Sequence, residues 1–130
     1  MSPDWRQVYE TTWEDLVRYL DRKVWDPERA RDLAQEAFVR ALASDAEIEN
    51  PRGWLFTVAA NLARDEARAA VRRRRHLRLV EAERNDRVEE PAGTEGMELE
   101  GRRAAVRAAL EKLAERDREV LLLWDAGLSY

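Results

Sequence analysis

The sequence contains no cysteine and only one histidine, His76, among its 130 residues. A chain without cysteine has neither a disulfide framework nor a thiolate nucleophile, and one histidine excludes a histidine-based metal cluster. No apolar run approaches the roughly 18 uninterrupted residues of a membrane-spanning helix, and the N-terminal MSPDWRQ lacks the features of a signal peptide. We therefore expect a cytoplasmic protein that carries no metal or other cofactor.

Signals for catalysis are also missing. The sequence has no glycine-rich phosphate loop. Its candidate acid pairs are Asp32 with Glu36 and Glu89 with Glu90. No nucleophile, oxyanion donor or metal ligand accompanies either pair, so we interpret both as surface charge and predict that the chain is not an enzyme.

What the sequence does contain is helical periodicity over most of its length. Apolar residues at helical spacing predict a first helix over Asp4–Val24, and Asp26 with Pro27 marks the start of a second. After a loop at Ser44–Asn50, a third helix is expected from Pro51 to about Arg78 or Ala82. No strand alternation or hairpin signal is present. The length and pattern predict one small all-α domain, or one domain plus a fragment.

The C-terminal third of the chain has a different composition. Residues 83–101 hold Pro91, Gly93 and Gly96 with few apolar side chains, which is typical of a flexible linker. A fourth helix is expected over roughly Arg102–Ala114, and a fifth from about Asp117 to a stop at Gly127. Ser129 is a candidate N-cap directly before the last residue, so we expect a truncation before a further helix.

The third predicted helix carries one narrow polar arc. With about 100° per residue, the arc spans roughly 100° of the helix surface. Its members are Thr57, Asn61, Arg64, Asp65, Arg68, Arg72 and Arg75, and Trp54 falls on the same side. The other side carries the apolar residues, with Glu66 among them; they are Leu55, Val58, Ala59, Leu62, Ala63, Ala69 and Ala70. Arginine and asparagine contact phosphates and base edges, but the same pattern also fits a solvated face with a core tryptophan.

Charge is unevenly distributed along the chain. The net charge is −4, yet residues 51–84 hold 9 basic and 4 acidic side chains. Residues 1–50 hold 7 basic and 12 acidic side chains, and residues 85–130 hold 7 and 11. Contact with a charged partner depends on the local charge of the surface and not on the net charge of the chain. The basic middle segment is therefore the region suited to an anionic partner.

A second candidate surface lies on the second helix. Asp32, Gln35, Glu36 and Val39 share the side away from the predicted core. An apolar centre with a polar rim is typical of a small protein interface, although a solvated acidic face has the same composition.

Three segments resemble a known family. DPERARDLAQEAFVRAL (26–42) and NPRGWLFTVAANLARDEARAAVRRRR (50–75) resemble region two of extracytoplasmic-function (ECF) sigma factors of bacterial RNA polymerase. AALEKLAERDREVLLLWDAGLSY (108–130) resembles the start of region four. The resemblance implies an all-α chain with a three-helix region-two domain at 1–83, a flexible linker at 84–101, and two helices of an incomplete helix-turn-helix region four at 102–130.

The resemblance also implies residue roles. Asp32, Gln35, Glu36 and Val39 would contact the clamp helices of the largest subunit of core polymerase, and Leu33 and Phe38 would be core. The loop at 43–50 would capture a flipped base of the minus-ten non-template strand, and an anti-sigma factor is an expected partner. The DNA-binding residues would be Asn50, Trp54, Asn61, Arg64, Asp65, Arg68, Arg72, Arg73 and Arg75.

Two departures from the family pattern bear on these expectations. Arg31 stands where the family often has an acidic residue, and the recognition helix of region four is absent from the sequence. The predicted fourth and fifth helices would then pack against region two, pack against another copy, or remain mobile. Two other classes stay open: a helix-turn-helix regulator that binds duplex DNA without polymerase, and a helical adaptor.

Overall fold

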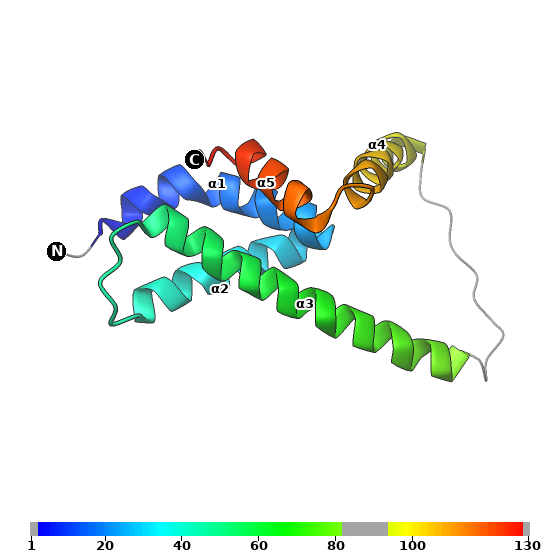
Figure 1. Ribbon diagram of the computed structural model, residues 1–130, viewed down its shortest axis with the longest axis horizontal. Coiled ribbons are helices and arrows are strands. Elements are labelled where there is room, and N and C mark those ends of the chain that lie inside the picture. The colour runs from blue at the N-terminus through cyan, green and yellow to red at the C-terminus, as the bar shows by residue number, and fades with distance from the viewer. Residues whose placement is uncertain (1–2, 82–93, 129–130) are drawn as a thin grey trace.

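The computed structural model describes residues 3–81 and 94–128, and every regular element in these ranges is a helix (Figure 1). The helices are α1 (Trp5–Val24), α2 (Pro27–Ala43), α3 (Pro51–Glu81), α4 (Thr94–Glu111) and α5 (Glu115–Asp125). The predicted all-α class is therefore confirmed. None of the helices in the described ranges is long and apolar enough to cross a membrane.

Each of the first three helices begins directly after a capping side chain. Asp4 accepts a hydrogen bond from the Gln7 amide at the start of α1, and Asp26 accepts from the amides of Glu28 and Arg29 at the start of α2. Asn50 accepts from the Gly53 amide at 3.1 Å at the start of α3. These side chains satisfy amides that have no partner within the helix, which fixes where each helix begins.

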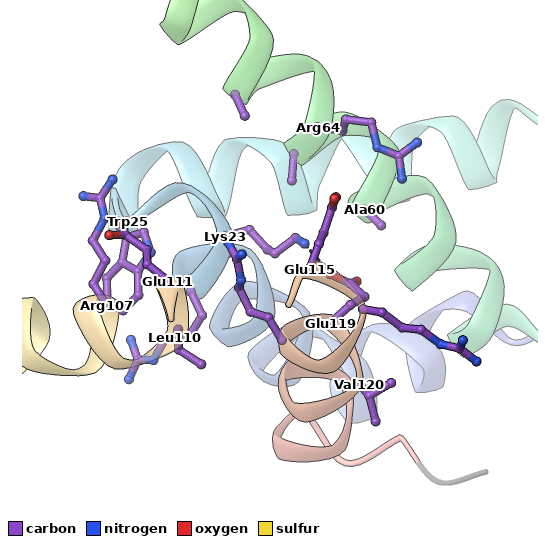
Figure 2. Close-up of a pocket in the computed structure, with 15 residues that line it drawn as sticks. Lys23, Trp25, Ala60, Arg64, Arg107, Leu110, Glu111, Glu115, Glu119 and Val120 are labelled. Carbon is purple, nitrogen blue, oxygen red and sulfur yellow. Dashed lines mark hydrogen bonds and ion pairs between the residues drawn. The ribbon is translucent and has the colours of Figure 1, made fainter. Parts of the chain in front are cut away.

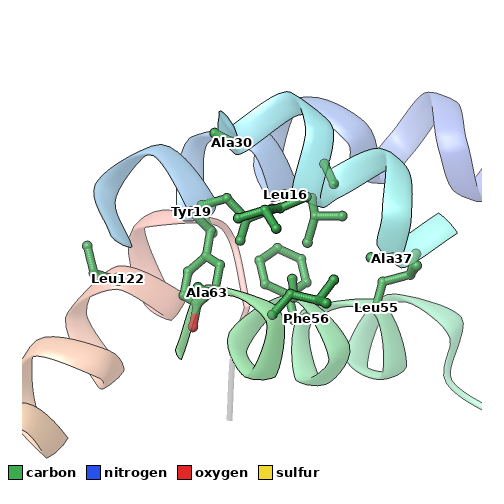
Figure 3. Close-up of a cluster of buried hydrophobic side chains, with 14 of the residues drawn as sticks. Leu16, Tyr19, Ala30, Ala37, Leu55, Phe56, Ala63 and Leu122 are labelled. Carbon is green, nitrogen blue, oxygen red and sulfur yellow. The ribbon is translucent and has the colours of Figure 1, made fainter. Parts of the chain in front are cut away.

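Helices α1, α2 and α3 pack around one apolar core (Figure 3). Leu16 and Leu20 of α1 and Leu55 of α3 are fully buried. Tyr19 is 1% exposed and packs edge-on against Phe56, with ring centroids 5.4 Å apart. Small residues allow the helices to approach one another; the buried ones are Ala30, Ala34, Ala37, Ala41, Ala59 and Ala63.

The second half of α3 runs past the ends of α1 and α2 (Figure 1). Residues 71–80 are all exposed, although Val71, Leu77, Leu79 and Val80 are apolar. The arginine run at 72–75 therefore lies on a helix that projects from the bundle.

One predicted boundary is wrong. The sequence predicts a linker that reaches residue 101, but α4 already begins at Thr94. Gly96 and Gly101 lower helix propensity without ending the helix, because glycine costs only about 1 kcal/mol relative to alanine at such a position. The rest of the expected linker, residues 84–93, lies outside the described residues.

Helix α5 (Glu115–Asp125) stops just before Gly127, the predicted stop signal, whose φ of 90° is left-handed. The Gly127 amide donates to the Trp124 carbonyl and the Leu128 amide to the Leu123 carbonyl, each at 3.0 Å. This pair of hydrogen bonds is the Schellman motif, which favours glycine at the left-handed position.

Of the three arrangements expected for the last two helices, the structure has the first, because α5 lies against α1 (Figure 1). Leu122 and Ala126 are 4% and 1% exposed and join the core of the bundle, as does Leu110 of α4. Leu121 and Trp124 are 43% and 69% exposed, so only part of the predicted apolar cluster at 121–124 is buried.

Candidate nucleic-acid interface

The polar arc of α3 is exposed along its whole length. Asn61, Arg64, Asp65, Arg68 and Arg72 are exposed, as are Thr57 and Arg75 at its ends. An open groove of about 640 Å³ follows the helix between the side chains of Arg64, Arg68 and Arg72. The helix is amphipathic because Leu55, Ala59 and Leu62 are turned into the core. The side chains predicted to share one arc are thus accessible from solvent together.

Glu66, the one acid on the apolar side of α3, has a structural role. Its carboxylate accepts hydrogen bonds from Arg29 of α2 at 2.7 and 3.1 Å, and Arg73 lies 3.5 Å away. The hydrogen bonds from Arg29, with a smaller contribution from Arg73, hold the pKa of Glu66 below its usual range, and Glu66 raises the pKa of Arg29. This ion pair ties α2 to α3 where the core ends.

Two predicted DNA contacts, Arg73 and Asn50, already have partners within the protein. The Arg73 guanidinium is turned toward Glu66 and lies outside the arc. The Asn50 carboxamide caps α3, and a Cβ at Gly53 would lie only 2.8 Å from the amide nitrogen of Asn50. The close approach explains why glycine follows this cap at the third helical position.

Trp54 is half-buried and packs against the core at the start of α3. It therefore anchors this end of the helix, while part of its side chain stays accessible to solvent.

The loop between α2 and α3 encloses a shallow hollow of about 330 Å³. Ile48 anchors the loop, being 9% exposed, and Ser44 caps it by accepting a hydrogen bond from the Ala46 amide at 3.1 Å. Pro3 and Trp5 from the start of the chain close the other side. The loop therefore forms a defined concave surface.

The predicted protein-binding face of α2 is also exposed. Asp32, Gln35 and Glu36 lie at the surface around Val39, which is 56% exposed. Arg29 lies 3.7 Å from Asp32, and Arg40 lies 3.0 Å from Glu36. Surface pairs of this kind add little stability, so they leave the carboxylates available to a partner.

Comparison with protein families matches residues 8–80 to Sigma-70 region 2. The chain belongs to the sigma-70 family. The matched residues comprise most of α1, all of α2 and nearly all of α3, so they carry both exposed faces described above. The predicted resemblance to region two is thereby confirmed.

Two relatives of similar sequence are an ECF sigma factor and a probable ECF sigma factor. The chain is 37% identical over 108 residues to the ECF RNA polymerase sigma factor EcfG of Rhodopseudomonas palustris, covering 79% of this chain and 56% of that protein. It is 33% identical over 121 residues to the probable ECF sigma factor SigI of Mycobacterium tuberculosis, covering 88% of this chain and 41% of that one. The chain thus spans about half the length of these relatives. No solved structure gave a significant match.

Sequence reasoning missed the surface where region two meets α4 and α5. A groove of about 900 Å³ lies there, between the end of α1, the middle of α3 and the last two helices (Figure 2). Arg64 lines both this groove and the groove along the arc. Within residues 3–81 and 94–128, no group of three or more His, Cys, Asp or Glu side chains is placed to hold a metal ion.

Proposed function

We propose that this chain acts as a sigma factor, which directs bacterial RNA polymerase to promoters and itself catalyses no reaction. In this role region two binds core polymerase and recognises and melts the minus-ten element, in the cytoplasm where transcription takes place. The observation that carries the proposal is the exposed arc of Asn61, Arg64, Asp65 and Arg68 on α3, inside the segment matched to Sigma-70 region 2.

The arc has the chemistry to bind a melted strand. Arg64, Arg68, Arg72 and Arg75 would neutralise phosphates, and each contact would steepen the dependence of log K on log salt by about 0.7 for a single strand. Asn61 and Asp65 offer the hydrogen-bonding groups that read base edges. Arg73 would bind a phosphate only after leaving Glu66, so we expect its contribution to be the smallest in the arginine run.

The hollow at the 44–50 loop supports the capture of an extruded base. Its walls combine the apolar Trp5 and Leu42 with the polar Ser44 and Glu47, and Trp54 and Asn50 stand at the start of the adjoining helix. Flipping a base costs a few kcal/mol, which a small domain meets more easily when polymerase adds its own contacts. A requirement for polymerase is therefore expected.

The second interaction that this function requires is binding to core polymerase, and we assign it to α2. We propose that Asp32, Gln35, Glu36 and Val39 dock on the clamp helices of the largest polymerase subunit. Arg31 is exposed beside Asp32 and places a cation on this acidic face. An anti-sigma factor would act by covering either this face or the arc.

The docking face is tested by charge reversal. D32R/E36R should weaken binding to core polymerase by at least tenfold in a pull-down titration, with an unchanged circular dichroism spectrum. E10R/E14R is the matched control, because it reverses two exposed acids on α1. Loss of polymerase binding in both variants, or in neither, would contradict the assignment to α2.

The arc is tested by promoter opening. N61A/R68A should reduce opening of a minus-ten duplex by polymerase holoenzyme, followed by 2-aminopurine fluorescence, and should leave core binding intact. R78A removes one exposed cation of α3 outside the arc and serves as the control. A gel shift of duplex DNA by the chain in the absence of polymerase would instead favour a stand-alone DNA-binding regulator.

A further inference from the structure

The groove along α3 has an apolar strip beside its row of cations. The residues that line it are Arg64, Asp65, Ala67, Arg68, Val71 and Arg72. Arg64, Arg68 and Arg72 follow one another at intervals of four residues, so they form one row on the helix surface. Ala67 and Val71 form a parallel row next to them. Both are exposed, Val71 to 48%, so the groove offers methyl groups as well as charge to a ligand.

Val71 has no role in the apolar core. It lies where α3 runs past the ends of α1 and α2 (Figure 1), and residues 71–80 are all exposed. β-Branched residues also have lower helix propensity than alanine, leucine or arginine. A valine at this position therefore stabilises neither the core nor the helix. Single exposed apolar residues are common on protein surfaces, but this one lines a groove together with three arginines.

The strip is preorganised for contact. A valine in a helix adopts essentially one χ1 rotamer, so its two methyl groups keep a fixed position. Ala67, one turn earlier, has no side-chain rotamers to lose, and its small size leaves the groove open beside Val71. Contact of a ligand with these two side chains therefore costs little side-chain entropy.

Charge determines where the backbone of a bound strand can lie. Among the described residues that line the groove, Asp65 is the only acid. A helix advances about 100° per residue, which places Asp65 and the strip of Ala67 and Val71 on opposite sides of the arginine row. Phosphates are attracted to the arginines and repelled by Asp65. The backbone should follow the arginine row, from which a base can turn toward the apolar strip.

The DNA bases differ in what they offer to such a strip. Thymine alone carries a methyl group, at C5, and apolar side chains such as alanine contact this group when proteins read DNA directly. Phosphate contacts position the strand without reading its sequence. A cationic row beside an apolar strip therefore fits a strand that presents thymine better than a strand of any other base.

We propose that Ala67 and Val71 are specificity-determining residues of the DNA-binding face, which recognise the methyl group of thymine. The C5 methyl group of an unpaired thymine packs on the two side chains, while the arginine row holds the neighbouring phosphates. The inference rests on the proposed function, because it names a base preference of the same DNA-binding face. It adds an apolar contact to the hydrogen bonds of Asn61 and Asp65.

The direct test compares two single strands that differ only in this methyl group. Fluorescein-labelled oligothymidine and oligodeoxyuridine are titrated with holoenzyme reconstituted from core polymerase and the full chain, and binding is followed by fluorescence anisotropy. Core polymerase alone supplies the background. Both oligomers carry the same phosphates, so the electrostatic contribution cancels in the ratio of the two affinities. Oligothymidine should bind about threefold more tightly, as partial burial of one methyl group predicts.

Variants of the strip assign this preference to its side chains. A67S/V71S should abolish the preference for oligothymidine and leave binding to core polymerase unchanged, whereas V71I, which stays apolar, should retain the preference. L77S is the matched control, since Leu77 is an exposed apolar residue of α3 outside the groove lining. A preference that survived in A67S/V71S, or disappeared in L77S, would overturn the proposal.

The outcomes separate this inference from the function on which it rests. Equal affinities for the two oligomers, with promoter opening still impaired in N61A/R68A, would overturn the methyl contact and leave the proposed function intact. If holoenzyme bound neither oligomer above the background and N61A/R68A opened the promoter normally, both the inference and the DNA-binding face would be wrong. A preference for oligothymidine that A67S/V71S removes and L77S retains supports the proposal.

Discussion

The α1–α3 bundle and the α4–α5 pair are held by different forces. The bundle rests on fully buried apolar side chains such as Leu16, Leu20 and Leu55. Among the described residues, the α4–α5 segment contributes Leu110, Leu122 and Ala126 to the buried core, with Leu123 and Leu128 packed against it, and ion pairs with α1 add polar contacts. Apolar burial is not screened by salt, whereas exposed and half-exposed ion pairs weaken as ionic strength rises.

The comparison teaches that the two parts respond differently to solution conditions and to partners. The bundle supplies a fixed platform for the polar arc and the α2 face. We expect salt to weaken the attachment of the last two helices more than that of the bundle, because ion pairs contribute to this attachment. We therefore expect substitutions in the bundle to unfold the whole protein and substitutions in α5 to act locally.

The largest effect is expected in the bundle. Leu55→Ala removes a fully buried side chain and leaves a cavity among α1, α2 and α3. Loss of about 3 kcal/mol of unfolding free energy is expected from urea denaturation. Val39→Ala is the control, since Val39 is 56% exposed and should change the unfolding free energy by less than about 0.5 kcal/mol. Equal effects at the two positions would mean that the bundle core is misassigned.

A local effect of intermediate size is expected from Leu122→Ala. Removing this side chain should weaken the docking of α5 by about 2 kcal/mol, because its apolar contact with the bundle is lost. Hydrogen exchange should become faster over residues 115–126 and stay unchanged in α1–α3. Leu121→Ala, on the exposed side of the same helix, is the control. Faster exchange throughout the bundle would remove the distinction between the two parts.

A smaller effect is expected at the end of α5. Gly127→Ala places a Cβ on a residue with φ of 90° and 3.2 Å from Arg52, so docking should weaken by about 1 kcal/mol. The exchange rate of amides at 124–128 measures the change. Gly101→Ala should instead be neutral or stabilising, because Gly101 is within α4 and a Cβ added there would meet no atom within 4 Å. Weaker docking in Gly127→Ala, with no loss of stability in Gly101→Ala, is the expected result.

The smallest effect is expected for Glu66→Gln. Arg29 lowers the pKa of Glu66 in the folded protein, so the carboxylate stabilises the fold above the ordinary glutamate pKa, and this contribution is lost as pH falls through the lowered value. We expect a loss of about 0.5 kcal/mol at neutral pH that vanishes in acid, measured by thermal unfolding across pH. Glu49→Gln, at an exposed loop position, should show no such dependence. A loss that persisted in acid would contradict an ionic role for Glu66.

Much of the fold followed from local sequence. Asp4, Asp26 and Asn50 fix the starts of α1, α2 and α3, because each cap uses amides only two or three residues away. The exposure of the arc followed from the apolar residues opposite it on the same helix. The start of α4 was misplaced, since glycine and proline lower helix propensity without showing where a helix must begin.

What the sequence determined by itself is the set of helices, the arc on α3, the exposed face of α2 and the membership of the sigma-70 family, because each depends on spacing within one segment. Only the tertiary structure decided that Glu66 pairs with Arg29 and that α5 covers Tyr19. Tyr19 and Glu119 stand 100 positions apart in the chain. No periodicity links residues so distant, and they meet because the apolar contacts of Leu122 and Ala126, together with the ion pairs, bring α5 onto α1.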